Sequence, residues 1–243
     1  RGFAHAGGKV FLGIRYGQPV TGSMRFKEAQ MAGGWSGVME ATRYPNRAVQ
    51  DKTLSTLGLP VGGALNEDCL FLNIYLPNSR GKSRPVLIWF HGGGFVAGSA
   101  NEYDGSVLAE QGDVVVVLVN SRLGPFGFFD WSYFGADYEG SASNGIRDQI
   151  LALRWVRENI EDYGGDPGNV MIFGQSSGAS SVLALLAAPA ADGERAGAAA
   201  ARRRLRRVAR RVVHRAVRRP AGRARRGGDR RDPQGARQFA RES

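Results

Sequence analysis

The sequence predicts an α/β protein whose central sheet is mostly parallel and carries helices on both faces. Three short segments are continuous apolar blocks, namely residues 85–90, 114–120 and 170–173. Strands of this composition are typically buried on both faces, as in parallel sheets. Apolar residues recur at helical spacing over residues 146–163, and residues 105–111 are a further helix candidate between two of the strands. The alternation of buried strands with helices predicts this fold class.

Two further strands are expected ahead of these elements. Residues 9–16 (KVFLGIRY) are rich in β-forming residues and predict a peripheral strand, and residues 67–76 (EDCLFLNIYL) alternate before they become apolar. Residues 35–42 are expected to form another short element. Residues 46–66 hold glycines and a proline and predict a long irregular segment, of a kind that is often functional.

The helix expected over residues 146–163 has recognisable end signals. Asn144 stands where an N-cap would, and Gly164 and Gly165 follow the last apolar position. Residues of these types favour a helix start and a helix stop, respectively.

The positive charge of the chain is confined to its last part. The 243 residues carry a formal net charge of +11, but residues 192–243 hold 18 arginines and five acidic groups, a net of +13. Residues 1–191 hold 15 basic and 17 acidic groups, a net of −2, which argues against a basic, nucleic-acid-seeking body. We therefore expect a folded domain at residues 1–189. Residues 190–243 form an Arg/Ala-rich low-complexity tail that is expected to be disordered or to result from a frameshift.

The alternative is a functional tail. Apolar residues between Leu205 and Val217 fall on one helical face with arginines opposite. Such a basic amphipathic helix can bind nucleic acid or an anionic membrane. The tail has almost no aromatic residues that could stack on bases, so no specific nucleic acid is expected as a partner.

The cysteine content and the hydropathy of the chain indicate where in the cell the protein is expected. Cys69 is the single cysteine, so the chain can form no intrachain disulfide. No apolar run is long enough to span a bilayer, and the first residues lack a signal-peptide pattern. These features favour a cytoplasmic location. Because the sequence begins at Arg1, a leader that precedes it stays an open alternative.

Residues 170–187 (VMIFGQSSGASSVLALLA) are the most informative about function. A buried strand, a tight turn with the pattern Gly-x-Ser-x-Gly and a helix follow one another here. A serine on such a turn has a reachable hydroxyl, and the flanking glycines let strand and helix pass closely. Backbone N–H groups at the helix start point to where an oxyanion would form. The pattern favours a nucleophilic Ser176 over a plain Gly/Ser-rich loop.

Several motifs occur together and in a fixed order. They are EDCLFLNIY, HGGGF, NSRLGP, GDPGNV and GQSSGA, which begin at residues 67, 91, 120, 165 and 174. Over roughly residues 9–188, the chain closely resembles the type-B carboxylesterase and cholinesterase family of α/β hydrolases. The resemblance implies an α/β-hydrolase fold, here with its C-terminal half missing, and serine hydrolysis of carboxylic esters through an acyl-enzyme.

The resemblance also implies roles for individual residues. Ser176 matches the nucleophile, and the N–H groups of an oxyanion hole fall on Gly93, Gly94 and Ser177. Successive glycines after a buried strand agree with this, because they let the main chain approach a ligand. His91 could be interpreted as a general base, but the resemblance implies a structural role for this position. A small-molecule carboxylic ester is the expected partner, and no cofactor or metal is expected.

Two ion pairs are implied by the resemblance and are expected to be partly buried. One joins Arg25 to Glu67, and the other joins Arg122 to Asp166. Gln175 stands where many relatives have glutamate, which argues against cationic choline-type substrates.

The single cysteine also departs from the family's secreted members. They pair the cysteine of the EDC motif with one upstream, and that upstream position falls on Ala48 here. Cys69 is therefore expected to be a free, buried thiol.

The family's triad also needs an acid and a histidine far beyond the nucleophile. The sole histidine after Ser176 is His214, and without a base a serine hydroxyl is a poor nucleophile. We therefore expect a carboxylic ester hydrolase by family that is inactive as this chain, the product of a disrupted or truncated gene. Two alternatives stay open. One is a competent hydrolase that uses His214, and the other is a non-catalytic, cholinesterase-like scaffold, against which the retention of Ser176 counts.

Overall fold

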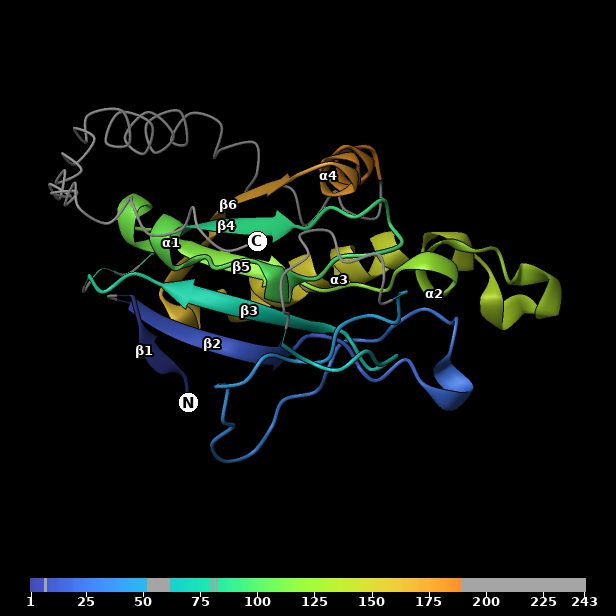
Figure 1. Ribbon diagram of the computed structural model, residues 1–243, viewed down its shortest axis with the longest axis horizontal. Coiled ribbons are helices and arrows are strands. Elements are labelled where there is room, and N and C mark those ends of the chain that lie inside the picture. Colours follow the sequence, from blue (N-terminus) through green and yellow to red (C-terminus); the bar gives the residue numbers. More distant parts are fainter. Residues whose placement is uncertain (7, 52–61, 80, 82, 189–243) are drawn as a thin grey trace, which may run out of the picture.

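A six-stranded sheet organises the part of the chain that the computed structural model describes, which is residues 1–6, 8–51, 62–79, 81 and 83–188. The strands lie in the order β1-β2-β3-β5-β4-β6 (Figure 1). Along the chain they are β1 (Phe3–His5), β2 (Gly8–Arg15), β3 (Phe71–Leu76), β4 (Arg84–Phe90), β5 (Val115–Val119) and β6 (Gly165–Gly174). The α-helices are α1 (Ser106–Gly112), α2 (Gly124–Phe128), α3 (Asn144–Asn159) and α4 (Ser177–Ala187). Short 3₁₀ turns are η1 (Gly22–Met24), η3 (Ala100–Glu102), η4 (Ser132–Phe134), η5 (Ala136–Tyr138), η6 (Ser141–Ser143) and η7 (Ile160–Tyr163).

The α/β class is confirmed, and the described sheet is mixed. β4 pairs in parallel with both β5 and β6, whereas β1, β2, β3 and β5 pair antiparallel in that order. The parallel strands are those that α1 and α3 separate along the chain, because a parallel pair needs a crossover connection. Parallel pairing is thus concentrated at the β5-β4-β6 side of the sheet.

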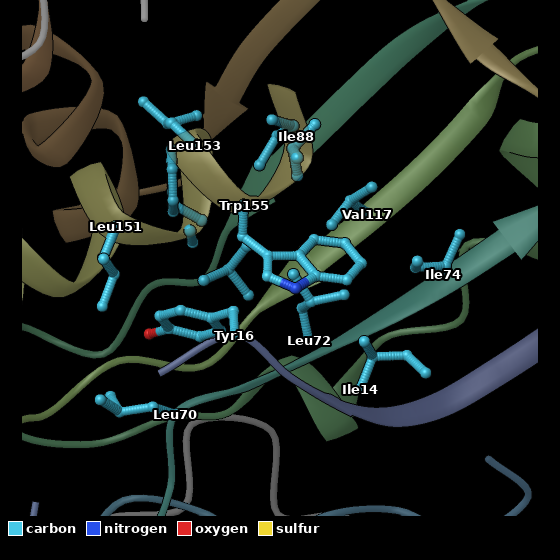
Figure 2. Close-up of a cluster of buried hydrophobic side chains, with 14 of the residues drawn as sticks. Ile14, Tyr16, Leu70, Leu72, Ile74, Ile88, Val117, Leu151, Leu153 and Trp155 are labelled. Atoms are coloured by element: carbon cyan, nitrogen blue, oxygen red, sulfur yellow. The ribbon is translucent and has the colours of Figure 1, made fainter. Parts of the chain in front are cut away.

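Helices cover both faces of the sheet, as expected. Val115, Val117 and Val119 of β5 belong to a core cluster with residues of α3 and with Leu185 of α4. The alternate residues of β5 join a second cluster, which includes Ala109 of α1. Figure 2 shows the first cluster, with Trp155 of α3 among the strand side chains. β5 is therefore buried on both faces, as its apolar composition predicts.

Most strand and helix predictions are confirmed with shifts of a residue or two. The exceptions among the strands are residues 170–173, where β6 begins already at Gly165, and residues 67–76, where β3 begins only at Phe71. The backbone N–H of Asp68 donates to the side chain of Asn66, and the Asp68 carboxylate pairs with Arg15 at 2.6 Å. One local bond and one bond to a residue 53 positions away thus hold Asp68 ahead of the strand.

The prediction of an element at residues 35–42 is wrong. The structure has neither helix nor strand there, and only Thr42 makes a single bridge to Leu12. Trp35 and Val38 are 50% and 72% exposed. Ala41 lies in the core and Met39 packs against it, so the segment is anchored there without forming a helix or a strand.

The predicted helix over residues 146–163 is α3 followed by η7, and its two end signals have different outcomes. Gly164 adopts a left-handed conformation (φ 77°) that ends η7, as predicted. Asn144 is not the cap, because Ser143 occupies the N-cap position and Asn144 is the first helical residue. Its buried side chain donates instead to the carbonyl oxygen of Phe26 at 2.6 Å.

Some expectations fall outside the described residues. They concern the tail at residues 190–243, which includes His214, and part of the irregular segment at residues 46–66. Within the described ranges, none of the helices combines the length and the apolar character that crossing a membrane requires.

Candidate active site

The backbone turns sharply between β6 and α4, and Ser176 lies at this turn. Its φ and ψ are 54° and −125°, a conformation that costs a residue with a side chain about 1–3 kcal/mol. The residue is exposed, and its carbonyl oxygen accepts the first helical bonds from Ala179 and Ser180. The structure therefore has the strand, strained turn and helix that the Gly-x-Ser-x-Gly pattern predicts.

Two glycines allow this turn to lie directly on the end of β4. A Cβ at Gly178 would collide with the carbonyl oxygens of Phe90 and His91, and one at Gly174 would collide with the backbone of Gly178. A side chain at either position would push α4 away from the sheet. The glycines of the motif are thus required by close packing.

The glycine segment after β4 leaves the sheet at the same edge as the serine turn. β4 and β6 are parallel neighbours in which Phe90 is paired with Gly174, so the segments that follow them start side by side (Figure 1). A Cβ at Gly92 would collide with the side-chain oxygen of Gln175. Gly93 has a φ of 118°, a conformation that residues with side chains rarely adopt.

Three backbone N–H groups at this edge have no acceptor among the described residues. They belong to Gly93, Gly94 and Ser177, whereas the neighbouring amides of Val96 and Gly178 donate to carbonyl oxygens of Gly93 and Gln175. The free N–H of Ser177 follows from its place as the first residue of α4. The four residues singled out from the sequence therefore lie on two adjacent turns, with one strained serine and three available donors.

His91 is placed as a structural residue. Its Nδ1 lies 2.8 Å from the carbonyl oxygen of Gly92, to which it can donate only as the Nδ1–H tautomer, and its ring packs against Gly98. Burial lowers the pKa of His91, which keeps the ring neutral near pH 7. Among the described residues, no histidine nitrogen hydrogen-bonds the hydroxyl of Ser176.

The end of the glycine segment is held by a residue that the sequence reasoning missed. The side-chain amide of Gln50 donates to the carbonyl oxygen of Gly98 at 2.9 Å, and the N–H of Gly98 donates back to Gln50 at 2.8 Å. Gln50 lies in a segment that was expected only to be irregular. Nothing in its local sequence signals a partner 48 residues away.

The predicted pair between Arg122 and Asp166 is wrong. Arg122 pairs with Asp148 of α3, with 2.7 Å between Nη2 and Oδ1, and both side chains are almost completely buried. Asp166 instead accepts from the backbone N–H of Gly168. The sequence did contain an indication that Asp148 is buried. Asp148, Ala152 and Trp155 share one helix face, and the latter two lie in the apolar core.

Two other predictions are confirmed. Arg25 pairs with Glu67 at 2.6 Å, although the arginine side chain is 47% exposed. Cys69 is a free, buried thiol, and it lines a small cavity together with Ala48. Burial raises the pKa of Cys69 far above its ordinary value, so the thiol stays protonated.

A metal centre has no support in the described part of the chain, which contains no group of three or more His, Cys, Asp or Glu side chains placed to hold an ion. The chemistry available at this edge is that of a hydroxyl nucleophile and backbone donors. This combination suits acyl transfer, in which negative charge develops on a carbonyl oxygen.

Most of the chain is similar to known proteins. A family model described as the carboxylesterase family matches residues 3–201. The para-nitrobenzyl esterase of Bacillus subtilis (strain 168) is 45% identical over 195 residues, which are 79% of this chain and 40% of that protein. Carboxylesterase 5A of Homo sapiens is 45% identical over 194 residues, 76% of this chain and 33% of that protein.

A solved structure agrees with these sequence matches. That of a thermophilic PNB esterase superposes with a TM-score of 0.75 and 44% identity, over 79% of this chain and 40% of that chain. The chain thus spans 33–40% of the length of these relatives.

Proposed function

This chain belongs to the carboxylesterase family, and from that premise we propose that its Ser176 site is built for the hydrolysis of carboxylic esters. In this proposal Oγ of Ser176 gives its proton to a base and bonds to the carbonyl carbon of the ester. The carbonyl oxygen takes up the negative charge and accepts hydrogen bonds from the N–H groups of Gly93, Gly94 and Ser177. When the intermediate collapses, the C–O bond breaks and the alcohol leaves with the proton.

The second half of the reaction regenerates the serine. Water replaces the alcohol as the attacking group, its proton passes to the base, and the same three N–H groups hold the new oxyanion. Breaking the acyl bond releases the carboxylic acid and returns the proton to Ser176. The substrate is accordingly a small-molecule carboxylic ester.

The observation that carries this proposal is the set of three unpaired amides beside a strained serine. The N–H of Ser177 is free because this residue begins α4, and those of Gly93 and Gly94 belong to a half-buried and an exposed residue. The three free donors thus lie on two adjacent turns. In serine hydrolases one such donor accounts for roughly 10²–10³ in kcat. Their position beside Ser176 supports an oxyanion site more than a plain loop.

We further propose that the chain by itself turns over esters negligibly, because its described residues offer Ser176 no base. Nδ1 of His91 contacts the carbonyl oxygen of Gly92 in its own loop. His5 lies on β1, at the opposite end of the strand order from β6, and its Nε2 is 3.2 Å from Asp104. With a p-nitrophenyl ester, a substantial rate that vanishes on Ser176→Ala would contradict this part of the proposal.

An activity probe with an external base tests the site itself. We expect a fluorophosphonate probe to label Ser176 slowly in the full chain and faster when imidazole is added as a base. Ser176→Ala should abolish the label, whereas Ser180→Ala, one turn along the exposed face of α4, should leave it unchanged. Equal labelling of the two variants, or no labelling at any imidazole concentration, would contradict the proposed site and favour a non-catalytic scaffold.

The oxyanion donors have their own measurement. We expect a phenylphosphonate anion, which resembles the tetrahedral intermediate, to shift the backbone amide resonances of Gly93, Gly94 and Ser177. The amide of Ala109 in α1, on the other face of the sheet, serves as the reference signal. Shifts of similar size at both places would indicate non-specific binding and would remove the support for an oxyanion hole.

A further inference from the structure

A small polar cavity lies beneath the first turns of α4. It is lined by the hydroxyl-bearing residues Ser121, Ser177 and Ser181 and by Gln149, together with apolar groups from the ends of β4 and β5. Its volume of about 10 Å³ is at the lower limit for a single water molecule, which needs about 10–15 Å³. The cavity therefore has room for one water and for no larger molecule.

Gln149 brings an unpaired polar atom to this cavity. The residue is only 5% exposed, and its Nε2 donates to Oγ of Ser181 at 3.1 Å, but its Oε1 has no partner among the described residues. Exchanging the two ends of the amide would not help, since Ser181 would then donate to the oxygen and leave the nitrogen unpaired. Buried polar atoms without a protein partner are usually paired with an ordered water.

We propose that one water molecule occupies this cavity and that Gln149 is a positioning residue for the serine turn. The water donates to Oε1 of Gln149 and uses its remaining bonds for the surrounding serine hydroxyls. Ser177 and Ser181 are four residues apart and share one face of α4. Gln149 thus holds this helix at Ser181 directly and at Ser177 through the water.

This arrangement connects α3 to the candidate oxyanion site. Ser177 supplies one of the three free N–H groups, and it directly follows Ser176. A loosened first turn of α4 would misplace both the donor and the nucleophile. The water site stands on the geometry of the cavity alone, whereas the positioning role rests on the proposed function of Ser176.

The water is tested by a high-resolution crystal structure of the full chain. We expect a density peak within hydrogen-bond distance of Oε1 of Gln149 and of at least one serine hydroxyl. In Gln149→Met, which has a similar shape but no amide, the peak should be lost. An unoccupied cavity in the wild-type chain, or a protein donor on Oε1, would overturn the water site.

The positioning role is tested with a pair of serine variants that change little volume. Ser181→Ala removes the partner of Gln149, and Ser180→Ala is the matched control on the exposed face of α4. We expect Ser181→Ala and Gln149→Met to shift the amide resonance of Ser177 and to slow imidazole-dependent labelling of Ser176 about tenfold, since small misplacements cost this much. Ser180→Ala should change neither quantity.

The outcomes separate the two proposals. An unshifted Ser177 resonance in a folded Ser181→Ala variant would overturn the positioning role. If the wild-type chain takes up no label, the proposed function fails, but the density and the resonance still report on Gln149. A melting temperature close to that of the wild-type chain in Ser181→Ala, together with slowed labelling, would separate positioning from a general loss of stability.

Discussion

The guanidinium group of Arg122 contacts both carboxylate oxygens of Asp148, with 2.9 Å between Nε and Oδ2 and 2.7 Å between Nη2 and Oδ1. The backbone N–H of Arg122 also donates to Oδ2 of Asp148 at 3.0 Å. Asp148 therefore fixes both the side chain and the backbone of the segment that follows β5. Leu123 of this segment lines the cavity beneath α4, so the pair also holds one wall of that cavity in place.

We expect Asp148→Asn to lower the free energy of unfolding by about 3–5 kcal/mol, because it leaves the Arg122 charge buried without its partner. Urea unfolding at neutral pH measures the change. The control is Asp137→Asn, whose pair with Lys27 is largely exposed at the aspartate and should matter far less. Similar decreases in the free energy of unfolding for the two variants would show that burial does not determine how much the Arg122 pair contributes to stability.

Gly178→Ala should destabilise the chain by about 2 kcal/mol or more. The new Cβ meets backbone oxygens of Phe90 and His91, which cannot move aside as a flexible side chain could. Gly33→Ala is the control, because a Cβ there has no atom within 4 Å and the change should stay within about 0.5 kcal/mol. Thermal unfolding followed by circular dichroism compares the two, and an unchanged Gly178→Ala variant would contradict the close packing of α4 on β4.

Ser176→Gly should raise the free energy of unfolding by about 1 kcal/mol while it removes any labelling by the activity probe. Glycine relieves the strain of the positive φ, and part of this gain is offset by the greater freedom of glycine in the unfolded chain. Ser176→Ala also loses the hydroxyl but keeps the strain, so its stability should stay near that of the wild-type chain. A Ser176→Gly variant no more stable than Ser176→Ala would mean that the turn is unstrained.

Asp113 should make the stability of the chain depend on acid pH. Its carboxylate accepts from the hydroxyl of Ser79 at 2.5 Å and from Nε of Arg84 at 3.0 Å. These bonds hold the pKa of Asp113 below its ordinary value. The resulting stabilisation is complete above the unfolded-state pKa and disappears as the pH falls through the lower, folded-state pKa.

The variant Asp113→Asn tests this contribution, and asparagine also tolerates the left-handed conformation of this position. Its destabilisation relative to the wild-type chain should be present at pH 7 and should shrink when urea unfolding is repeated at pH 3. Glu158→Gln on α3 makes the same kind of charge-removing change away from Ser79 and Arg84 and provides the comparison. A destabilisation of the same size at both pH values would assign the effect of Asp113 to packing.

Much of the fold follows from local sequence. The apolar block at residues 114–120 predicts a strand buried on both faces, and β5 has its alternate side chains in two separate cores. The serine turn was equally predictable, because only glycine fits at positions 174 and 178 once a strand and a helix pass so closely. In both cases the information lies within a few neighbouring residues.

Other features depend on groups that are distant in the sequence. Residues 35–42 look like a short element, but the backbone of Ala41 is hydrogen-bonded to the distant residues Arg1 and Leu12. Asn144 looks like a cap, but its side chain donates to the carbonyl oxygen of Phe26. The partner of Arg122 was likewise misassigned. Such choices are decided by which polar group arrives within hydrogen-bond distance after the elements have packed.

The sequence by itself thus determined the strand and helix types, the serine turn and the glycine segment, because each is a matter of local backbone conformation and apolar spacing. Only the tertiary structure decided that the turns after β4 and β6 leave one edge together, that three amides there stay unpaired, and that Gln149 lies beneath α4. These are relations between residues up to 84 positions apart, such as Phe90 and Gly174. Buried polar groups bond to the partners that lie near them in space, and the order of residues along the chain does not reveal which partners these are.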